Sequence, residues 1–118
     1  MIVDAHHHFW DPGRRDYPWM GDELSAIRRP YVPDDLRPEL IQNNVDRTVL
    51  VQTVSSLEET REFLETASRT DFIAGVVGWV DLTDPSVADV IANCGASDVN
   101  AAFARLTTQD TAARSANP

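Results

Sequence analysis

Two histidines near the start of the chain, His6 and His8, have the type and spacing that most directly indicate chemistry. Residues 1–6 form a short apolar run typical of a β-strand, and alternate side chains of a strand share one face. His6 and His8 would therefore point the same way, with Cα atoms about 7 Å apart, and His7 would point the opposite way. Two imidazoles arranged like this could share one divalent metal ion, and zinc is the favoured candidate.

A metal held by His6 and His8 would lower the pKa of a bound water toward neutrality and polarise a substrate carbonyl. Two other interpretations are open: histidines that only satisfy structural hydrogen bonds, and the remnant of a purification tag. A functional site is favoured because the pair lies where a predicted strand ends. Parallel α/β proteins place their sites at that end of the strands.

The elements that must position the histidines alternate between strands and helices. Apolar β-branched runs predict strands, and helical spacing of apolar residues predicts helices. The predicted elements are strands at 1–6, 48–53 and 73–80, and helices at 34–41, 57–67 and 85–91. This alternation predicts an α/β fold with a parallel sheet and right-handed crossovers.

Helix starts are marked by short polar residues. Ser55 or Ser56 can cap the second helix, each with a glutamate three residues later, Glu58 or Glu59, in the capping-box relation. Asp84 is expected to cap the third helix, with a proline in its first turn.

A long segment, 9–37, separates the first strand from the first helix and contains four prolines. Loops of this length inside a compact domain are often functional lids. Its large aromatic residues predict an ordered, packed loop; they are Trp10, Tyr17, Trp19 and Tyr31.

The composition narrows the class of protein. The chain has 118 residues, 42% of them hydrophobic, and a net charge of −9, with 10 basic and 19 acidic residues. A chain this acidic is not expected to bind nucleic acid or an anionic membrane. The longest apolar run, 73–80, is too short to cross a bilayer. One cysteine and a start without a basic and apolar leader pattern predict a cytoplasmic protein.

Several segments, in matching order, resemble the amidohydrolase-related family of metal-dependent hydrolases. Within that family the sequence is most similar to the sugar lactonases related to L-fuconolactonase and the pyrone-dicarboxylate lactonases. The similarity covers residues 2 to about 92. The matching segments are DAHHHFWDP from Asp4, YPWM from Tyr17, VPDDL from Val32, RTVLVQ from Arg47 and GVVGWVDL from Gly75.

The resemblance implies a (β/α)₈ TIM barrel with its site at the C-terminal mouth. It implies that His6 and His8 are catalytic residues that bind a metal or polarise the substrate. A sugar lactone would be the substrate, with Gln52, Trp10 and Trp19 in contact with it. Zinc would be the cofactor, although some related branches hydrolyse lactones without a metal.

Other roles remain open for several of these residues. Gln52 could be a buried amide that ties two strands together. Asp81 could line the site or cap its own loop, and Asp4 could accept a histidine N–H or only begin the strand.

The length departs from the family pattern. A (β/α)₈ barrel takes about 250 residues, whereas this chain supplies three βα units over residues 1–93. Residues 94–118 are expected to form an aperiodic tail, and a frameshift near Asn93 would explain the break. The resemblance implies that later strands carry more histidines and an aspartate base. The chain is therefore expected to be a truncated, inactive fragment.

Two alternatives belong to other classes. The chain could be a small non-catalytic α/β module with a histidine metal site, or two or more copies could assemble to complete a barrel-like layer. The oligomeric state is left open.

Overall fold

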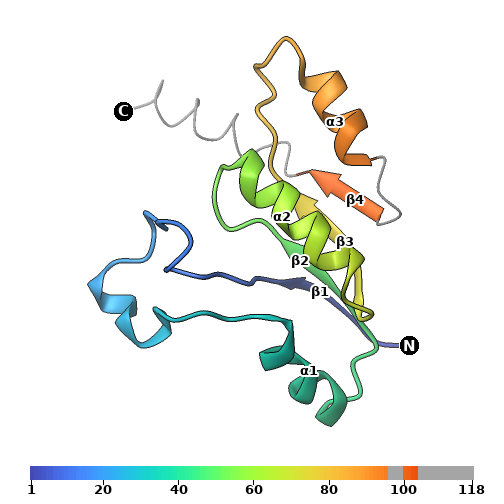
Figure 1. The fold of residues 1–118 in the computed structure, drawn as a ribbon. Coiled ribbons are helices and arrows are strands. Elements are labelled where there is room, and N and C mark those ends of the chain that lie inside the picture. Colours follow the sequence, from blue (N-terminus) through green and yellow to red (C-terminus); the bar gives the residue numbers. More distant parts are fainter. Residues whose placement is uncertain (96–99, 104–118) are drawn as a thin grey trace.

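The computed structural model of the chain describes residues 1–95 and 100–103. Four parallel strands form one sheet in the order β1-β2-β3-β4, with helices between them (Figure 1). This confirms the predicted α/β fold with a parallel sheet. The elements are β1 (Val3–His7), the 3₁₀ helix η1 (Asp22–Ile27), α1 (Pro33–Gln42), β2 (Arg47–Val51), α2 (Leu57–Ser68), β3 (Ile73–Gly78), α3 (Val87–Gly95) and β4 (Asn100–Phe103).

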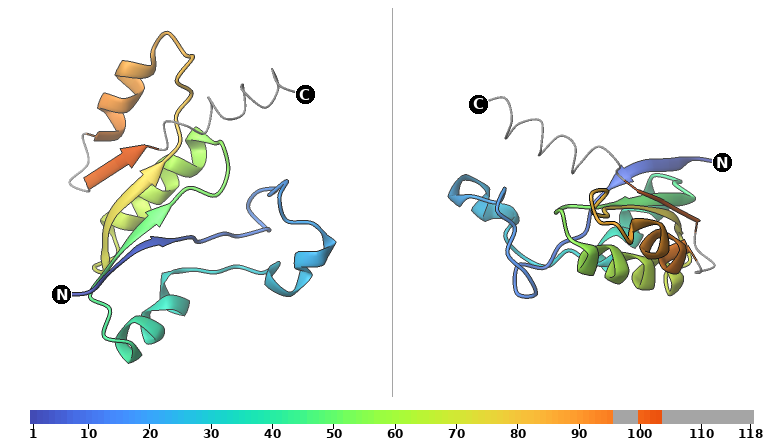
Figure 2. Two further views of the ribbon diagram at one scale, coloured as in Figure 1. Left: turned by 180° about the vertical axis from the view of Figure 1, so that it is seen from behind. Right: turned by 90° about the horizontal axis from the view of Figure 1, so that it is seen from above.

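All three α-helices lie on one face of the sheet (Figure 2). The core lies between this face and the helices, because Leu50 of β2 and Val76 of β3 are buried there. Leu40 of α1 and Phe63 of α2 pack against them. Within the described part of the chain no helix covers the opposite face.

The strand β4 was not expected from the sequence. Residues 94–118 were predicted to be an aperiodic tail, but α3 continues to Gly95 and Asn100–Phe103 pairs with β3 in parallel register. The prediction was wrong for these residues because two alanines in a four-residue strand give almost no hydrophobic pattern. A strand can still form there, since β3 offers an unpaired backbone edge. Residues 96–99 and 104–118 lie outside the described structure, and the division at residue 93 stays a prediction.

The helix starts differ from the predictions in detail. Ser56, and not Ser55, caps α2, and its hydroxyl accepts the Glu59 N–H at 3.1 Å. The Glu59 carboxylate does not complete a capping box, because it bonds to residues after β2 instead. The α3 helix begins at Val87, so Asp84 caps the turn before it and accepts the Ser86 N–H at 2.8 Å.

The long loop between β1 and α1 is tied together by its own backbone and aromatic residues. The Tyr31 N–H donates to the Trp10 carbonyl at 2.9 Å, which brings the two ends of the loop together. The Trp10 indole N–H donates to the Ile27 carbonyl at 3.0 Å. Tyr17 and Met20 are buried. The loop is therefore packed, as its aromatic content predicted.

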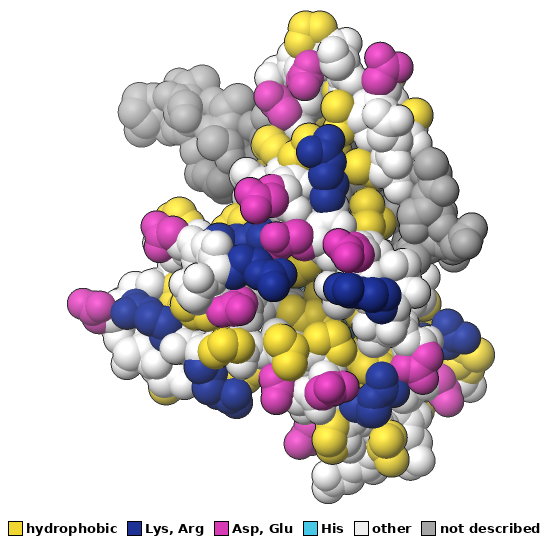
Figure 3. Space-filling view, in the orientation of Figure 1, with side chains coloured by type: hydrophobic (Ala, Val, Ile, Leu, Met, Phe, Trp, Pro, Cys, Tyr) yellow, Lys and Arg dark blue, Asp and Glu magenta, His cyan; other side chains and the backbone are white. Residues whose placement is uncertain are grey.

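Charged pairs connect this loop to the helix layer. Figure 3 shows arginine and acidic side chains intermingled on the helix-covered face, with apolar side chains gathered between them. Arg15 of the loop pairs with Glu62 of α2. Arg37 of α1 pairs with Asp71 at 2.9 Å, just before β3.

Within the part of the chain that the structure describes, no helix is long and apolar enough to span a membrane.

Candidate active site

His6 and His8 meet at the carboxyl end of β1. Their Nε2 atoms are 3.2 Å apart, and the two rings meet edge to face with centroids 4.9 Å apart. The register of β1 against β2 shifts between Asp4 and His7, and the Asp4 carboxylate accepts the His6 backbone N–H at 3.1 Å within this irregularity. The strand geometry thus brings together the two histidines that the sequence singled out.

The orientation of His8 is set by the neighbouring strand. Its Nδ1 lies 2.8 Å from the carbonyl oxygen of Val51, the last residue of β2. A carbonyl only accepts, so Nδ1 carries the proton and Nε2 of the neutral ring keeps a free electron pair. That electron pair is directed into the space shared with His6.

His7 points to the other face of the sheet, as strand alternation predicted. Its Nε2 lies 2.8 Å from the Thr48 hydroxyl, and its ring contacts Phe9 edge to face. Burial lowers the pKa of the His7 ring, because a charged imidazole loses hydration there. This histidine therefore belongs to the core side of the sheet and not to the candidate site.

An open hollow of about 290 Å³ adjoins His8. Two tryptophans form one wall, with ring centroids 5.4 Å apart. The Trp19 indole N–H donates to the Thr53 carbonyl at 3.0 Å, which holds the loop against the end of β2. The residues lining this hollow, here called the aromatic pocket, are His8, Trp10, Trp19, Gln52 and Thr53.

The structure therefore places Gln52 and both predicted tryptophans beside His8. The Gln52 backbone N–H also donates to the Val77 carbonyl at 2.7 Å. This bond holds the residue after β2 against β3 at the carboxyl end of the sheet. Their contact with a substrate stays a prediction.

Asp81 and Asp4 take local roles. One Asp81 oxygen accepts the Thr83 N–H at 2.9 Å and the Thr83 hydroxyl at 2.6 Å. Both bonds lower the pKa of the Asp81 carboxyl, and the bond from the Thr83 hydroxyl has the larger effect. Of the two interpretations, loop capping is the one that the contacts favour. Asp4 accepts a backbone N–H of His6 and not a ring N–H.

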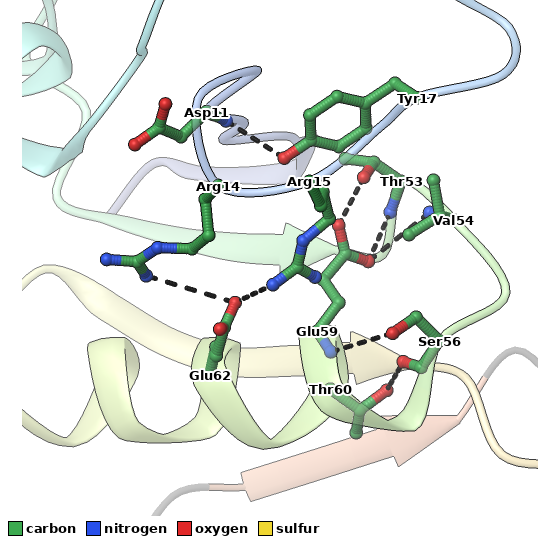
Figure 4. A network of polar contacts seen from close by, with 10 residues as sticks. All are labelled: Asp11, Arg14, Arg15, Tyr17, Thr53, Val54, Ser56, Glu59, Thr60 and Glu62. Atoms are coloured by element: carbon green, nitrogen blue, oxygen red, sulfur yellow. Dashed lines mark hydrogen bonds and ion pairs between the residues drawn. The ribbon is translucent and has the colours of Figure 1, made fainter.

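Three residues near the pocket were not singled out as site residues. Thr53 lines it, Glu59 of α2 bonds to Thr53, and Arg15 packs against the same helix (Figure 4). A glutamate three residues after Ser56 was the only available signal, and it was interpreted as a capping box. The other contacts join segments that only the fold brings together.

A metal ion would find two nitrogen donors here. Within the described residues no group of three or more His, Cys, Asp and Glu residues could hold a metal. In this part of the chain, a metal ion at the site would therefore be held by the Nε2 atoms of His6 and His8.

Comparisons with known proteins agree with the predicted fold. No protein-family profile matches the chain. It is 51% identical to an L-fucono-1,5-lactonase of Burkholderia ambifaria over 80 residues, which are 68% of this chain and 28% of that protein. It is 38% identical to an L-fucono-1,5-lactonase of Burkholderia multivorans over 92 residues, 78% of this chain and 31% of that protein.

Solved structures of amidohydrolases are also similar to this chain. A crystal structure of an amidohydrolase from Burkholderia multivorans with bound HEPES superposes with a TM-score of 0.78 at 34% identity, covering 84% of this chain and 34% of that one. A second crystal structure of such an amidohydrolase, with bound zinc, gives a TM-score of 0.72 at 36% identity over 78% of this chain and 32% of that one. The chain is thus similar in sequence and fold to part of an amidohydrolase.

The chain spans about a third of the length of the relatives it matches. Its alternating strands and helices correspond to the N-terminal part of an amidohydrolase TIM barrel, as the sequence predicted. The helix-free face of the sheet is the face on which the histidine pair and the aromatic pocket lie.

Proposed function

We propose that this chain provides the first part of the active site of a hydrolase that opens the lactone of a sugar acid. One observation carries the proposal: the His6 and His8 Nε2 atoms converge to 3.2 Å beside the aromatic pocket. The similarity to two L-fucono-1,5-lactonases supports the reaction class.

The donor set fits a zinc ion. Two ligands bound at about 2.0–2.1 Å in a tetrahedral arrangement have nitrogen atoms about 3.3 Å apart, close to the 3.2 Å observed. The Val51 carbonyl holds His8 in the tautomer that a metal needs. A similar amidohydrolase contains zinc. When bound, such a metal polarises a carbonyl and activates water.

The chain's own residues have separable roles in this proposal. His6 and His8 hold the metal or, without one, form an N–H···N bond in which His6 donates and His8 accepts. Trp10 and Trp19 exclude water from one side of the lactone ring, and the Gln52 amide bonds to a ring substituent. A carboxylate base would come from outside the described residues.

The isolated chain is proposed to be inactive, since its described residues offer two metal ligands and no candidate base beside them. Its cytoplasmic location, the identity of the lactone and the truncated nature of the chain stay predictions.

A chimera tests the reaction class. The matching 80 residues of the Burkholderia ambifaria lactonase would be replaced by those of this chain. Hydrolysis of L-fucono-1,5-lactone would then be measured by the release of protons from the acid product. We expect an active chimera. His6→Ala or His8→Ala should lower kcat/KM by more than about 100-fold, since changes around metal ligands alone cost about 10–100-fold.

His7→Gln is the matched control, because glutamine can keep the bond to Thr48 and His7 faces away from the pocket. It should change kcat/KM far less than the other two substitutions. An inactive but folded chimera, or equal losses for all three histidines, would contradict the proposal.

A zinc titration of the isolated chain separates the hydrolase from the non-catalytic metal-binding module. Two ligands predict weak binding that His8→Ala abolishes, measured by calorimetry. Tight binding that His8→Ala also abolishes would favour the non-catalytic module, whose metal site is formed by the histidines.

A further inference from the structure

We propose that Glu59 is a positioning residue whose buried carboxylate fixes the turn after β2 and thereby places Trp19 in the wall of the aromatic pocket. The description of this pocket as a substrate site rests on the proposed function. The positioning itself rests on the contacts of Glu59 alone.

The Glu59 carboxylate is buried and fully engaged. Glu59 is 1% exposed although it lies in the first turn of α2. One oxygen accepts the Thr53 N–H at 2.9 Å and the Val54 N–H at 3.3 Å, and the other accepts the Thr53 hydroxyl (Figure 4). Because a buried carboxylate is costly without such donors, its position and that of the turn determine each other.

Helix capping does not explain this arrangement. Ser56 already caps α2 through its hydroxyl. The Ser56 N–H, which a capping-box glutamate would bind, donates to the Val54 carbonyl at 3.0 Å. The carboxylate of Glu59 is thus directed away from its own helix end and toward the strand end.

The hydrogen bonds of Thr53 connect this turn to the pocket. Thr53 gives both of its hydrogens to Glu59, and its carbonyl accepts the Trp19 indole N–H at 3.0 Å. Trp19 in turn contacts Trp10 edge to face and lines the pocket with His8. A single residue, Thr53, therefore links the helix layer to the pocket wall.

The experiment compares Glu59→Ala and Glu59→Gln in the 118-residue chain by the exchange of tryptophan indole protons with water, measured by NMR. Glutamine can keep all three contacts: its carbonyl accepts both N–H groups and its amide donates to the Thr53 hydroxyl. Alanine loses all three. We expect Glu59→Ala to speed exchange of the Trp19 indole about tenfold or more, and Glu59→Gln to stay within about twofold of the parent.

Glu58→Ala and Glu58→Gln are matched controls. Glu58 precedes Glu59 in the same helical turn and carries the same charge, but it is exposed. Both variants should leave the Trp19 exchange rate unchanged. The Trp79 indole serves as the reference for global opening, and Trp19→Phe assigns the Trp19 signal.

The proposal is overturned if Glu59→Ala leaves Trp19 exchange unchanged, if all indoles accelerate equally, or if Glu59→Gln behaves like Glu59→Ala. Should Glu59→Ala not fold, Thr53→Val tests the same link, because it removes only the hydroxyl contact. Selective acceleration of Trp19 exchange in Thr53→Val supports the proposal, and no change contradicts it. These measurements need neither lactone nor metal, so their failure is distinct from failure of the chimera assay.

Discussion

The three consecutive histidines serve two sides of one sheet. His6 and His8 converge on the helix-free face, whereas His7 bonds to Thr48 on the side of the core. The carbonyl of Val51 then decides which nitrogen of His8 is available to a ligand. A one-residue change in register would exchange these roles, because it moves every side chain to the opposite face.

At the residue scale, the environment of Tyr17 predicts how the stability of the fold depends on pH. It is buried and its hydroxyl accepts the Asp11 N–H at 2.9 Å. Burial, the larger effect, raises the pKa of Tyr17, and the Asp11 N–H opposes it. The unfolded chain therefore releases this proton first, and the stability linked to Tyr17 is lost as pH rises from about 10 through the higher folded pKa.

An ultraviolet titration of the two tyrosines checks this expectation. One should ionise later than the other, and Tyr17→Phe should remove the late component. The unfolding free energy of Tyr17→Phe should also fall less steeply above pH 10. Loss of the early component instead would show that Tyr31 is the shifted residue.

At the scale of elements, β3 and α2 meet closely at a glycine. A Cβ atom on Gly78 would lie 2.6 Å from Cγ2 of Thr60. Thr60 is fully buried, and its hydroxyl bonds to the Trp79 carbonyl and N–H at 2.7 and 2.8 Å. These bonds prevent Thr60 from rotating away, so the contact requires glycine.

Gly78→Ala is expected to lower the unfolding free energy by about 1–3 kcal/mol through overpacking. Urea denaturation followed by circular dichroism measures the loss. Adding Thr60→Ser, which removes Cγ2 and keeps the hydroxyl, should recover part of it. If Thr60→Ser recovers nothing, the collision with Cγ2 is not the cause.

At the scale of the whole molecule, the described part of the sheet has one open face. Within the described residues, helices cover one face, and Val49, Val51 and Val77 on the other face are partly exposed. Parallel sheets are normally covered on both faces. In a closed barrel this inner face would be buried by the remaining strands.

The isolated chain should therefore bind a dye such as ANS and associate as its concentration rises. Val51→Thr, nearly equal in volume, should reduce both effects. Ile41→Thr is the control, because Ile41 is 70% exposed on α1 and lies on the other side of the sheet. Sedimentation measures the association; a monomer without dye binding at all concentrations would contradict the expectation.

The amino-acid pattern alone was sufficient to predict the alternation of strands and helices, the parallel sheet and the shared face of His6 and His8. These features follow from periodicity within single elements, which a sequence displays directly. The tertiary structure alone decided that Val51 orients His8, that Glu59 bonds to Thr53 and not to its own helix end, and that β4 joins the sheet. Each of these depends on backbone or polar groups of separate segments, whose approach no local pattern encodes.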